Sequence, residues 1–540
     1  MFVRKVVIEN FKRFKEKHTF EFTDGLNILV GDNEIGKSTV LEAVHLALTG
    51  YYHGNRIERE LSQYLFNKEA TDEWLKNKKL PEIFIEVFLG VCKDEMFKGN
   101  FNSDKDENAF GIRFSIIFND EYKEEYEKIS EEKKISGLPV EYYKIQWETF
   151  ARERITTRSV PIKSSLIDTS EYRYGNASDA YVAGIVKNYL DDSERPRIAQ
   201  AYRELKEKFG ENEIVKSIND KLRKETESIG GVNSVFGSPI VAVDMGSANA
   251  WEKSLIVKLE NIPLPYRGKG CQKFVKTELA LSKKQSENAD IILLEEPENH
   301  LSFSKLNQLV EYISRRCSEK QIIVSTHSSF VANKLGLNTL IWVSEKGCMR
   351  LKDLTGNTTD YFKKLPGYDT LRLILCKAAI LIEGPSDELI VQRAYKDKCG
   401  KLPIEDGIDV ISVGALSFKR FLEIAEKLGL KDVRVVTDND GKPEKVEEKY
   451  KKYLDKEGIS IFFTKNSDLT TLEPNLVKAD PSNAEILNKI FKKSYKDEDA
   501  LIKYMQENKT ACALVIFESP EKIKYPKYIQ DAVDFGNQEQ

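Results

Sequence analysis

Eight consecutive residues near the amino terminus have the composition of a loop that binds nucleotide phosphates. Residues Gly31–Ser38, GDNEIGKS, fit the pattern G-x-x-x-x-G-K-[ST], between the β-like run Leu26–Val30 and a helix-like run. In such a loop, backbone N–H groups wrap the phosphates, the lysine meets the β/γ charge and the hydroxyl ligates Mg²⁺. We therefore predict a phosphate-binding loop rather than a solvated glycine turn. The predicted nucleotide contacts are Asn33, Gly36, Lys37, Ser38 and Thr39.

Two acidic residues follow a later apolar run, where a nucleotide site needs a metal ligand and a base. The run Ile291–Leu294 predicts a buried strand, and Glu295 and Glu296 come directly after it. We predict that Glu295 holds the magnesium shell and that Glu296 is the base that polarises the attacking water. His327 follows the strand-like Ile322–Val324 and could sense the γ-phosphate, with a structural role as the alternative.

A second group of acidic residues lies at two predicted strand ends further along the chain. Glu383 and Asp387 are four residues apart at a strand-to-helix junction, while Asp438 and Asp440 follow the strand-like Val433–Thr437 and would share a face in extended chain. Open α/β sheets place ligands at the carboxyl ends of parallel strands. Because such a cluster is costly without cations, it predicts Mg²⁺ or Mn²⁺ with oxygen ligands. A β-turn is the alternative for the D-N-D run alone.

The elements around these motifs indicate an α/β chain of several domains. Its 540 residues, 41% hydrophobic and 31% charged, are typical of a multidomain globular protein. Short β-like runs up to Ile167 predict antiparallel sheet, helix-like runs extend from about Ala177 to Glu227, and alternating strand-like and helix-like runs after Ala379 imply a parallel sheet. The predicted segments are a first nucleotide-binding part at 1–175, a helical insertion at 176–230, a second nucleotide-binding part at 231–365 and a last domain at 372–540.

Composition narrows the setting in which the protein works. The seven cysteines include no CxxC pair, which argues against a disulfide framework and a structural zinc site. A net charge of −4 makes the chain no polycation, so nucleic-acid binding would need local clusters of lysine. No run reaches the ~18 apolar residues of a membrane span, and the amino terminus lacks a signal-peptide pattern. We expect a cytoplasmic protein without a membrane partner.

The amino-terminal motifs resemble the ATP-binding-cassette (ABC) superfamily of the recombination and chromosome-maintenance type. The resemblance rests on the run Ile8–Phe14, on Asn33 within G-x-N-x-x-G-K-[ST], on a D-loop at Glu298–Ser302 and on His327 as switch histidine. It implies two ATPase heads that sandwich nucleotide, each completing the other's site with a signature sequence. Gly268–Gln272 takes the signature position but departs from the LSGGQ pattern.

The later acidic motifs resemble the Toprim domain that topoisomerases, primases and certain nucleases share. The matching order is E-G-x-x-D at Glu383–Asp387, S-V-G at Ser412–Gly414 and D-x-D at Asp438–Asp440. The resemblance implies that Glu383 is a general acid or base or a metal ligand, and that both aspartates of D-x-D are metal ligands. Since no tyrosine lies in a recognisable site, cleavage by water is favoured over transesterification.

The combination of an ATPase head, a helical insertion and a Toprim domain resembles the overcoming-lysogenization-defect (OLD) family of nucleases, which includes the nuclease-ATPase subunit of Gabija antiphage systems. The resemblance covers most of the chain. It implies that a further acid, matched by Glu473, and a carboxyl-terminal lysine, matched by Lys509, complete the second metal site. Solvated surface residues are the alternative for both. The expected fold is α/β multidomain: an ABC-type P-loop head with an inserted helical dimerisation segment, then a parallel Toprim domain.

Together these features predict an ATP-binding, metal-dependent DNA endonuclease that acts in antiphage defence or DNA repair. Nicking or double-strand cleavage would proceed by two-metal hydrolysis, with Glu383 and Lys509 as catalytic groups and Lys509 neutralising transition-state charge. The expected cofactors are ATP, two Mg²⁺ or Mn²⁺ ions at the Toprim site and one with the nucleotide. The ATPase would regulate cleavage, and the sequence leaves the sign of that effect open.

Partners and alternatives follow from the same motifs. The amphipathic insertion would supply the interface of a homodimer or higher homo-oligomer, with packing against the head as the alternative. The resemblance leaves room for a helicase or another defence-system protein as a partner. The alternative functions are a nucleotide-switched nucleic-acid-binding protein with an inactive Toprim site, and an RNA-directed nuclease such as one that cuts tRNA.

Overall fold

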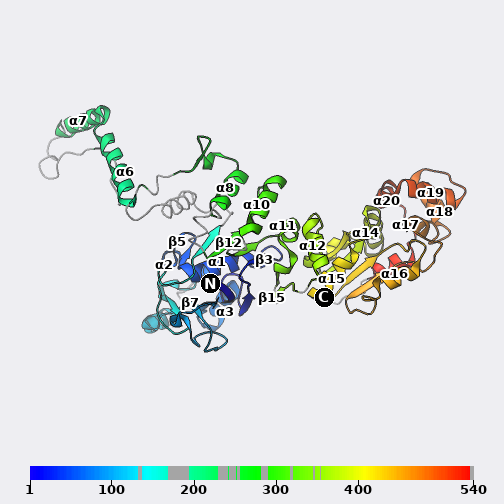
Figure 1. Cartoon of the computed structure of the whole chain (residues 1–540), viewed down its shortest axis with the longest axis horizontal. Coiled ribbons are helices and arrows are strands. Elements are labelled where there is room, and N and C mark those ends of the chain that lie inside the picture. The colour runs from blue at the N-terminus through cyan, green and yellow to red at the C-terminus, as the bar shows by residue number, and fades with distance from the viewer. Residues whose placement is uncertain are drawn as a thin grey trace. The chain divides into compact units, whose positions relative to one another are not determined.

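A computed structural model gives the fold of the chain in two compact units (Figure 1). The first unit comprises Met1–Leu26 and Ser38–Val324, and the second comprises Asn27–Lys37 and Ser325–Gln540. Residues 176–193 and 229–230 of the predicted insertion lie outside the described residues. The described residues are 1–131, 137–167, 194–228, 241–242, 251, 256–280, 290–316, 320–344, 347–352 and 354–534.

An antiparallel sheet forms the amino-terminal part of the first unit, as the short alternating runs predict. Its strand order is β2-β1-β6-β7-β8, and each neighbouring pair is antiparallel. The side chains of Val87 and Ile112, paired across β6 and β7, are fully buried, so the apolar positions of the strands form a core face. The strands are β1 (Phe2–Glu9), β2 (His18–Glu21), β6 (Ile83–Gly90), β7 (Gly111–Phe118) and β8 (Tyr143–Thr149).

One strand of the first unit differs from the sequence expectation. We expected antiparallel sheet up to Ile167, but β9 (Ser164–Ile167) pairs in parallel with β12 (Ile291–Glu295). Residues Ile291 to Leu294 of β12 are completely or almost completely buried, which fits a parallel strand covered on both faces. The antiparallel prediction for β9 is therefore wrong, because its partner lies far along the chain.

Helices make up most of the remaining first unit. The predicted insertion is helical where it is described, as α6 and α7 (Figure 1). The described part of this unit also contains two short β-hairpins, β4 (Tyr51–Tyr52) with β5 (Asn55–Arg56) and β10 (Lys258–Leu259) with β11 (Ile262–Pro263). The helices are α1 (Lys37–Thr49), α2 (Ile57–Glu60), α3 (Lys68–Asn77), α4 (Lys123–Glu131), α6 (Glu194–Gly210), α7 (Glu213–Ser228), α8 (Lys269–Ala280) and α10 (Phe303–Arg316).

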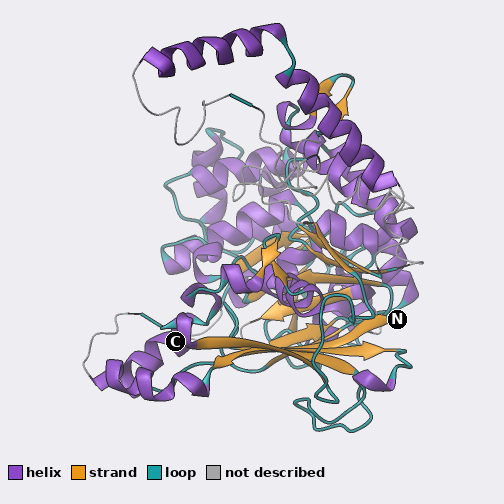
Figure 2. Ribbon diagram, turned by 90° about the vertical axis from the view of Figure 1, so that its left-hand side faces the viewer, coloured by secondary structure: helices purple, strands orange, loops and turns teal. Residues whose placement is uncertain are grey.

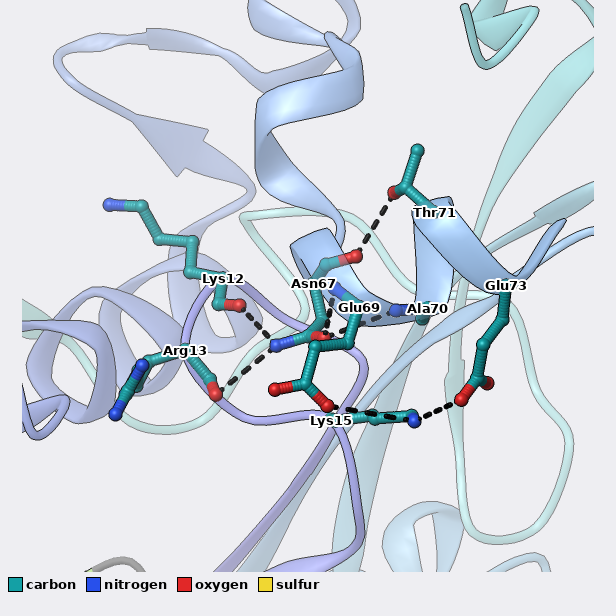
Figure 3. A network of polar contacts seen from close by, with 8 residues as sticks. All are labelled: Lys12, Arg13, Lys15, Asn67, Glu69, Ala70, Thr71 and Glu73. Atoms are coloured by element: carbon teal, nitrogen blue, oxygen red, sulfur yellow. Dashed lines mark hydrogen bonds and ion pairs between the residues drawn. The ribbon is translucent and has the colours of Figure 1, made fainter. Parts of the chain in front are cut away.

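A buried asparagine joins the first turn of α3 to the loop after β1 (Figure 3). The Asn67 side chain accepts hydrogen bonds from the backbone N–H groups of Glu69 and Ala70, at 3.0 and 3.2 Å. Its amide donates to the carbonyl oxygens of Lys12 and Arg13, at 2.8 and 3.2 Å. One side chain therefore caps the helix and fixes the loop.

Replacing Asn67 with alanine is expected to loosen α3. The change removes the hydrogen bonds that cap α3 and those that the Asn67 amide donates to the loop after β1. The free energy of local opening of α3 should therefore fall by about 1–3 kcal/mol. Hydrogen exchange of the α3 amides measures this opening directly. Lys76→Ala, at an exposed position of the same helix, is the control; equal protection in the two variants would contradict the role of Asn67.

The second unit contains a four-stranded parallel sheet, in agreement with the alternating pattern after Ala379. Its order is β17-β16-β18-β19, and every neighbouring pair is parallel. Ile380 and Ile382 of β16 are fully buried beneath α14 and the last helices of the chain. The strands, drawn in orange like all strands in Figure 2, are β16 (Ala378–Ile382), β17 (Ile408–Ser412), β18 (Val433–Val436) and β19 (Ile459–Phe462).

A helix follows each strand of this sheet, and further helices then run to the end of the described chain. The connecting helices are α14 (Pro385–Cys399), α15 (Phe418–Leu428) and α16 (Pro443–Tyr450). The last helices are α17 (Leu472–Val477), α18 (Asn483–Phe491), α19 (Glu498–Glu507), α20 (Lys509–Glu518) and α21 (Lys527–Ala532). Within the described segments, no helix combines the length and apolar character that a membrane crossing requires.

The second unit also holds the strand that leads into the phosphate loop. Strand β3 (Leu26–Val30) pairs in parallel with β14 (Leu340–Ser344), which pairs in turn with the antiparallel β15 (Gly347–Arg350). The predicted strand near Ile322 is β13 (Gln321–Ser325). The remaining helices are α11 (Ser329–Leu335), α12 (Gly356–Lys364) and α13 (Thr370–Leu375).

Candidate active site

Four carboxylates converge at the carboxyl ends of two adjacent parallel strands in the second unit. Glu383 follows β16 and Asp438 follows β18, while Asp387 lies in the first turn of α14 and Glu473 in the first turn of α17. Asp438 interacts electrostatically with each of the other three. We call these four residues the acid cluster. The structure thus brings together four of the five predicted metal ligands.

Short-range hydrogen bonds hold two members of the acid cluster in place. The Glu383 carboxylate accepts from the Thr437 hydroxyl at 2.6 Å and from the backbone N–H of Asp438 at 3.3 Å. The Asp387 carboxylate accepts from the backbone N–H of Gly384 at 3.1 Å, at the start of α14. Because these donors belong to the strand ends themselves, the sheet fixes where the carboxylates point.

Glu473 brings the predicted lysine to the cluster. Its side chain is only 5% exposed, and one carboxylate oxygen accepts from the Thr471 hydroxyl at 2.7 Å. The other lies 3.9 Å from Nζ of Lys509, whose side chain is half exposed. The ammonium group of Lys509 therefore lies at the edge of the acid cluster and remains accessible to solvent.

Burial and mutual repulsion raise the pKa values of two members of the acid cluster. Burial, followed by the charges of Asp387, Glu383 and Glu473, raises the pKa of Asp438 to about 8, and Lys509 opposes this rise. Burial and the neighbouring acids raise the pKa of Asp387 to about 7. Shifts of this kind are typical of functional sites, because a stable surface seldom crowds four like charges.

The donor set of the acid cluster suits a divalent cation. Carboxylate oxygens are the ligands that Mg²⁺ and Mn²⁺ prefer, and a bound cation would offset the repulsion that raises the pKa values. Among the described residues, no three His, Cys, Asp or Glu side chains are already gathered closely enough to hold one ion. An ion would therefore have to draw the carboxylates closer together.

Asp440, the fifth predicted ligand, lies in the turn that follows Asp438, and its place in a metal site stays a prediction. It is exposed, with a φ of 47°, and its backbone N–H donates to the carbonyl oxygen of Thr470 at 3.2 Å. The left-handed residue turns the chain after Asp438, so the extended geometry that would put both aspartates on one face does not hold. Burial lowers the pKa of Lys449 in α16, and the charges of Glu383 and Asp440 oppose this shift.

A buried tyrosine beside the acid cluster has no signal in the sequence. Tyr528 of α21 is 8% exposed, and burial together with all four acids raises its pKa well above the ordinary value. Helix α21 packs on β18 and α14, which end and begin at the cluster. Since this contact joins distant parts of the chain, no local motif could reveal it.

A guanidinium buried behind the site ties α14 to α20, the helix that begins with Lys509. Arg393 pairs with Asp397 at 3.0 Å, and at the other end of α14 the Ser386 and Thr510 hydroxyls lie 3.4 Å apart. The two helices therefore lie side by side with their amino-terminal ends at the acid cluster. Arg393 donates, at 2.6 to 3.0 Å, to the carbonyl oxygens of Ile516, Phe517, Ser519 and Glu521.

The phosphate loop has the predicted local structure. Lys37 is buried and its Nζ donates to the carbonyl oxygens of Gly31 and Asp32, at 2.9 and 2.8 Å. Gly36 has a φ of 110°, which favours glycine. Asn33 is exposed on the loop. The lysine thus holds the loop that precedes it, and phosphate binding by this loop stays a prediction.

The segment that carries His327 runs beside the strand that leads into this loop. The N–H of Thr326 donates to the carbonyl oxygen of Leu29 in β3, at 3.1 Å. His327 follows directly and is exposed. Its contact with a γ-phosphate stays a prediction.

In the first unit, the predicted acids stand at the end of β12. The Ser38 hydroxyl donates to the Glu295 carboxylate, which fits a shared magnesium shell. Glu296 has a φ of 41°, and its carboxylate accepts from the Asn299 side chain at 2.6 Å. Thr39, beside the loop, is buried. The roles of these residues stay predictions.

The predicted signature segment contacts the predicted D-loop. Gly270 lies in the first turn of α8, so close to the carbonyl oxygen of His300 that a Cβ atom there would clash. His300 itself has a φ of 63°. The departure from LSGGQ therefore keeps a glycine where the backbone of the neighbouring loop approaches.

Comparisons with known families fit both sites. A model of an AAA domain matches residues 5–229, and one described as an AAA domain, putative AbiEii toxin of a type IV toxin–antitoxin system, matches residues 265–333. The Toprim domain of overcoming lysogenization defect protein-like proteins matches residues 374–440. The chain joins an AAA ATPase to an OLD-type Toprim domain. The match to the OLD-type Toprim domain includes three of the four acids of the cluster, Glu383, Asp387 and Asp438.

Curated relatives and solved structures resemble parts of this chain. Endonuclease GajA of Bacillus cereus (strain VD045) is 22% identical over 469 residues, which cover 82% of this chain and 75% of GajA. The DNA replication and repair protein RecF of Clostridium tetani (strain Massachusetts / E88) is 26% identical over 121 residues, 22% of this chain and 33% of RecF. An SMC head bound to the C-winged helix domain of ScpA has a TM-score of 0.34 at 14% identity, covering 65% of this chain and 98% of that one.

The two domains and the likeness to GajA support an enzyme with nuclease and ATPase activity. The ATPase and Toprim domains imply the use of a nucleotide and of divalent metal in general.

Proposed function

We propose that this chain is a divalent-metal-dependent DNA endonuclease that hydrolyses phosphodiester bonds at the acid cluster under the control of its ATPase. The observation that carries the proposal is the gathering of four carboxylates, one buried and three half-buried, where burial and the neighbouring charges raise the pKa of Asp438 to about 8. Two bound Mg²⁺ or Mn²⁺ ions would supply an activated water and charge stabilisation for the leaving oxygen. The likeness to an endonuclease supports the same reaction class.

Each residue of the site has a role that its surroundings support. The acid cluster would hold the ions, with Asp440 completing the set from its exposed position. Glu383, which already accepts two hydrogen bonds, would hold or move a proton at its carboxylate. Lys509, half exposed beside Glu473, would offset the extra negative charge of the transition state.

The nucleotide site would regulate cleavage rather than perform it. Asn33, Gly36 and Lys37 would wrap the phosphates, and Ser38 with Glu295 would hold one Mg²⁺ ion, which their hydrogen bond supports. Thr39 would add a further contact. Glu296 would polarise the attacking water, and His327 would report the γ-phosphate.

The helices α6 and α7 support a homodimer or higher homo-oligomer. None of the described side chains of α6 is buried. Four large apolar residues of the two helices are between 43% and 70% exposed: Leu205, Phe209, Ile214 and Ile218. Exposed apolar side chains of this size are costly in water and favour association. We extend the proposal to antiphage defence or DNA repair, with a helicase or another defence-system protein as a partner.

Cleavage of supercoiled plasmid with Mg²⁺ or Mn²⁺, with and without ATP, tests the proposed function. Wild type should nick or linearise the plasmid, and Glu383→Gln should lower the rate by about 10²-fold or more. Glu457→Gln, an exposed glutamate of the same unit, is the matched control and should cut normally. Equal rates for Glu383→Gln and wild type would overturn the proposal, and cleavage of tRNA alone would replace DNA with RNA as the substrate.

A further inference from the structure

A basic pocket lies in the second unit, between the start of α12 and one side of α15. Its volume is about 420 Å³. Four cationic side chains line it against a single carboxylate, and no established motif includes it. The residues that line it include Thr355, Lys419, Arg420, Glu423, Lys427 and Lys452.

The single carboxylate of the basic pocket accepts three hydrogen bonds. Glu423 is 7% exposed and accepts from the backbone N–H of Thr355 at 2.6 Å and from its hydroxyl at 3.0 Å. It also accepts from the Thr358 hydroxyl. Because Glu423 caps the start of α12 in this way, it is not an ion-pair partner for the lysines around it.

Two of the three lysines of the basic pocket have no acidic partner among the residues that the structure describes. Lys452 pairs with Glu426 at 2.6 Å, outside the pocket lining. Lys419 and Lys427 are exposed and form no ion pair with any described residue. Their charges are therefore available to an anion in the pocket.

The guanidinium of Arg420 is held in position before any ligand arrives. It lies 4.0 Å from the ring centre of Tyr361 and donates to the carbonyl oxygen of Leu416 at 2.8 Å. The Tyr361 hydroxyl is itself bonded to Tyr368 and Ser417, both at 2.7 Å. A half-buried guanidinium that is held in position in this way suits a phosphate oxygen.

Basic side chains connect the pocket to the acid cluster. Lys449 of α16 is within electrostatic range of Glu383 on one side and of Lys419 on the other. Its Nζ donates to the carbonyl oxygen of Ala415, at 3.2 Å. Lys449 is therefore a basic side chain near both the acid cluster and the basic pocket.

We propose that the basic pocket binds a backbone phosphate of the nucleic-acid substrate, other than the phosphate that is cleaved. The inference rests on the proposed nuclease function. Lysine and arginine contacts to phosphate fix the position of a strand without reading its bases, so the pocket orients the substrate and carries no sequence preference. A free phosphate or nucleotide shares this chemistry and is distinguished by the test.

Binding of a short fluorescent DNA duplex, measured without metal across a salt series, tests the proposal. Lys419→Gln/Lys427→Gln should raise the dissociation constant about 10-fold and reduce the salt slope by about 1. Cleavage with Mg²⁺ should show a raised KM with unchanged kcat, since no group at the reacting atoms is altered. The control, Lys492→Gln/Lys496→Gln, makes the same charge change at two exposed lysines elsewhere in the unit.

The outcomes separate this inference from the proposed function. DNA affinity and salt slope equal to those of the control would overturn the phosphate assignment. Binding of inorganic phosphate or ADP that the double variant abolishes, with DNA affinity unchanged, would also overturn it in favour of a small-anion site. If wild type binds DNA with the expected variant effect but cuts nothing, the pocket assignment holds and the nuclease proposal fails.

Discussion

Replacing Asp438 with asparagine is expected to lower metal-dependent cleavage by about 10³-fold or more. Asp438 is the member of the acid cluster that feels all three others, so it stands where an ion would bring them together. Asparagine keeps the shape but removes the charge, and a cation then meets a weaker ligand set. Plasmid cleavage at saturating Mg²⁺ measures the loss.

The same substitution should stabilise the metal-free protein. Asp438 and Asp387 have pKa values of about 8 and about 7 in the folded state, against roughly 3.9 in an unfolded chain. Because the folded-state pKa is raised, the stabilisation is complete below the unfolded value and is lost as the pH rises to 7–8. The thermal midpoint of the metal-free wild type should therefore decrease as the pH is raised from 5 to 8. The midpoint of Asp438→Asn should decrease less over the same range.

Adding Mg²⁺ gives the converse measurement. At pH 8 the ion should raise the midpoint of wild type, since it offsets the repulsion between the carboxylates, and should raise that of Asp438→Asn much less. Asp468→Asn, at an exposed aspartate of the same unit, serves as control and should behave as wild type. Full cleavage by Asp438→Asn, or an unchanged response to Mg²⁺, would refute the assignment of Asp438 as a ligand.

Chemistry carried by neighbouring residues could be predicted from the sequence. Glu383 and Asp387 flank the junction of β16 and α14, where Gly384 and Pro385 start the helix, so strand, turn and helix signals all point to one place. The phosphate loop is a second case, because Gly36 and Lys37 lie within one turn. In both cases the geometry depends on a few consecutive residues and needs no knowledge of distant contacts.

Features that depend on distant contacts could not be predicted. The short run of β9 does not specify its partner, so its parallel pairing with β12 escaped the alternation pattern. Tyr528 reaches the acid cluster only through the packing of α21 on β18. A local feature was also not predicted. The spacing of Asp438 and Asp440 suggested extended chain, but the positive φ of Asp440 shows a turn there.

Replacing Lys37 with alanine is expected to lower ATP hydrolysis by about 10²-fold or more, since the β/γ charge loses its main cationic partner. In the structure Lys37 Nζ is held by the carbonyl oxygens of Gly31 and Asp32, so the ammonium already faces the space inside the loop. Alanine leaves those carbonyls exposed to a phosphate they would repel. Release of inorganic phosphate, measured over a range of ATP concentrations, quantifies the loss.

The nuclease of Lys37→Ala then reports how nucleotide acts on the acid cluster. If ATP restrains cleavage, the variant should cut in the presence of ATP as wild type does without it; if ATP licenses cleavage, the variant should remain inactive at every ATP concentration. Lys334→Ala, in α11 of the same unit, is the control and should keep the wild-type response. A Lys37→Ala protein that hydrolyses ATP at the wild-type rate would show that Gly31–Ser38 is a glycine turn and that nucleotide binds elsewhere.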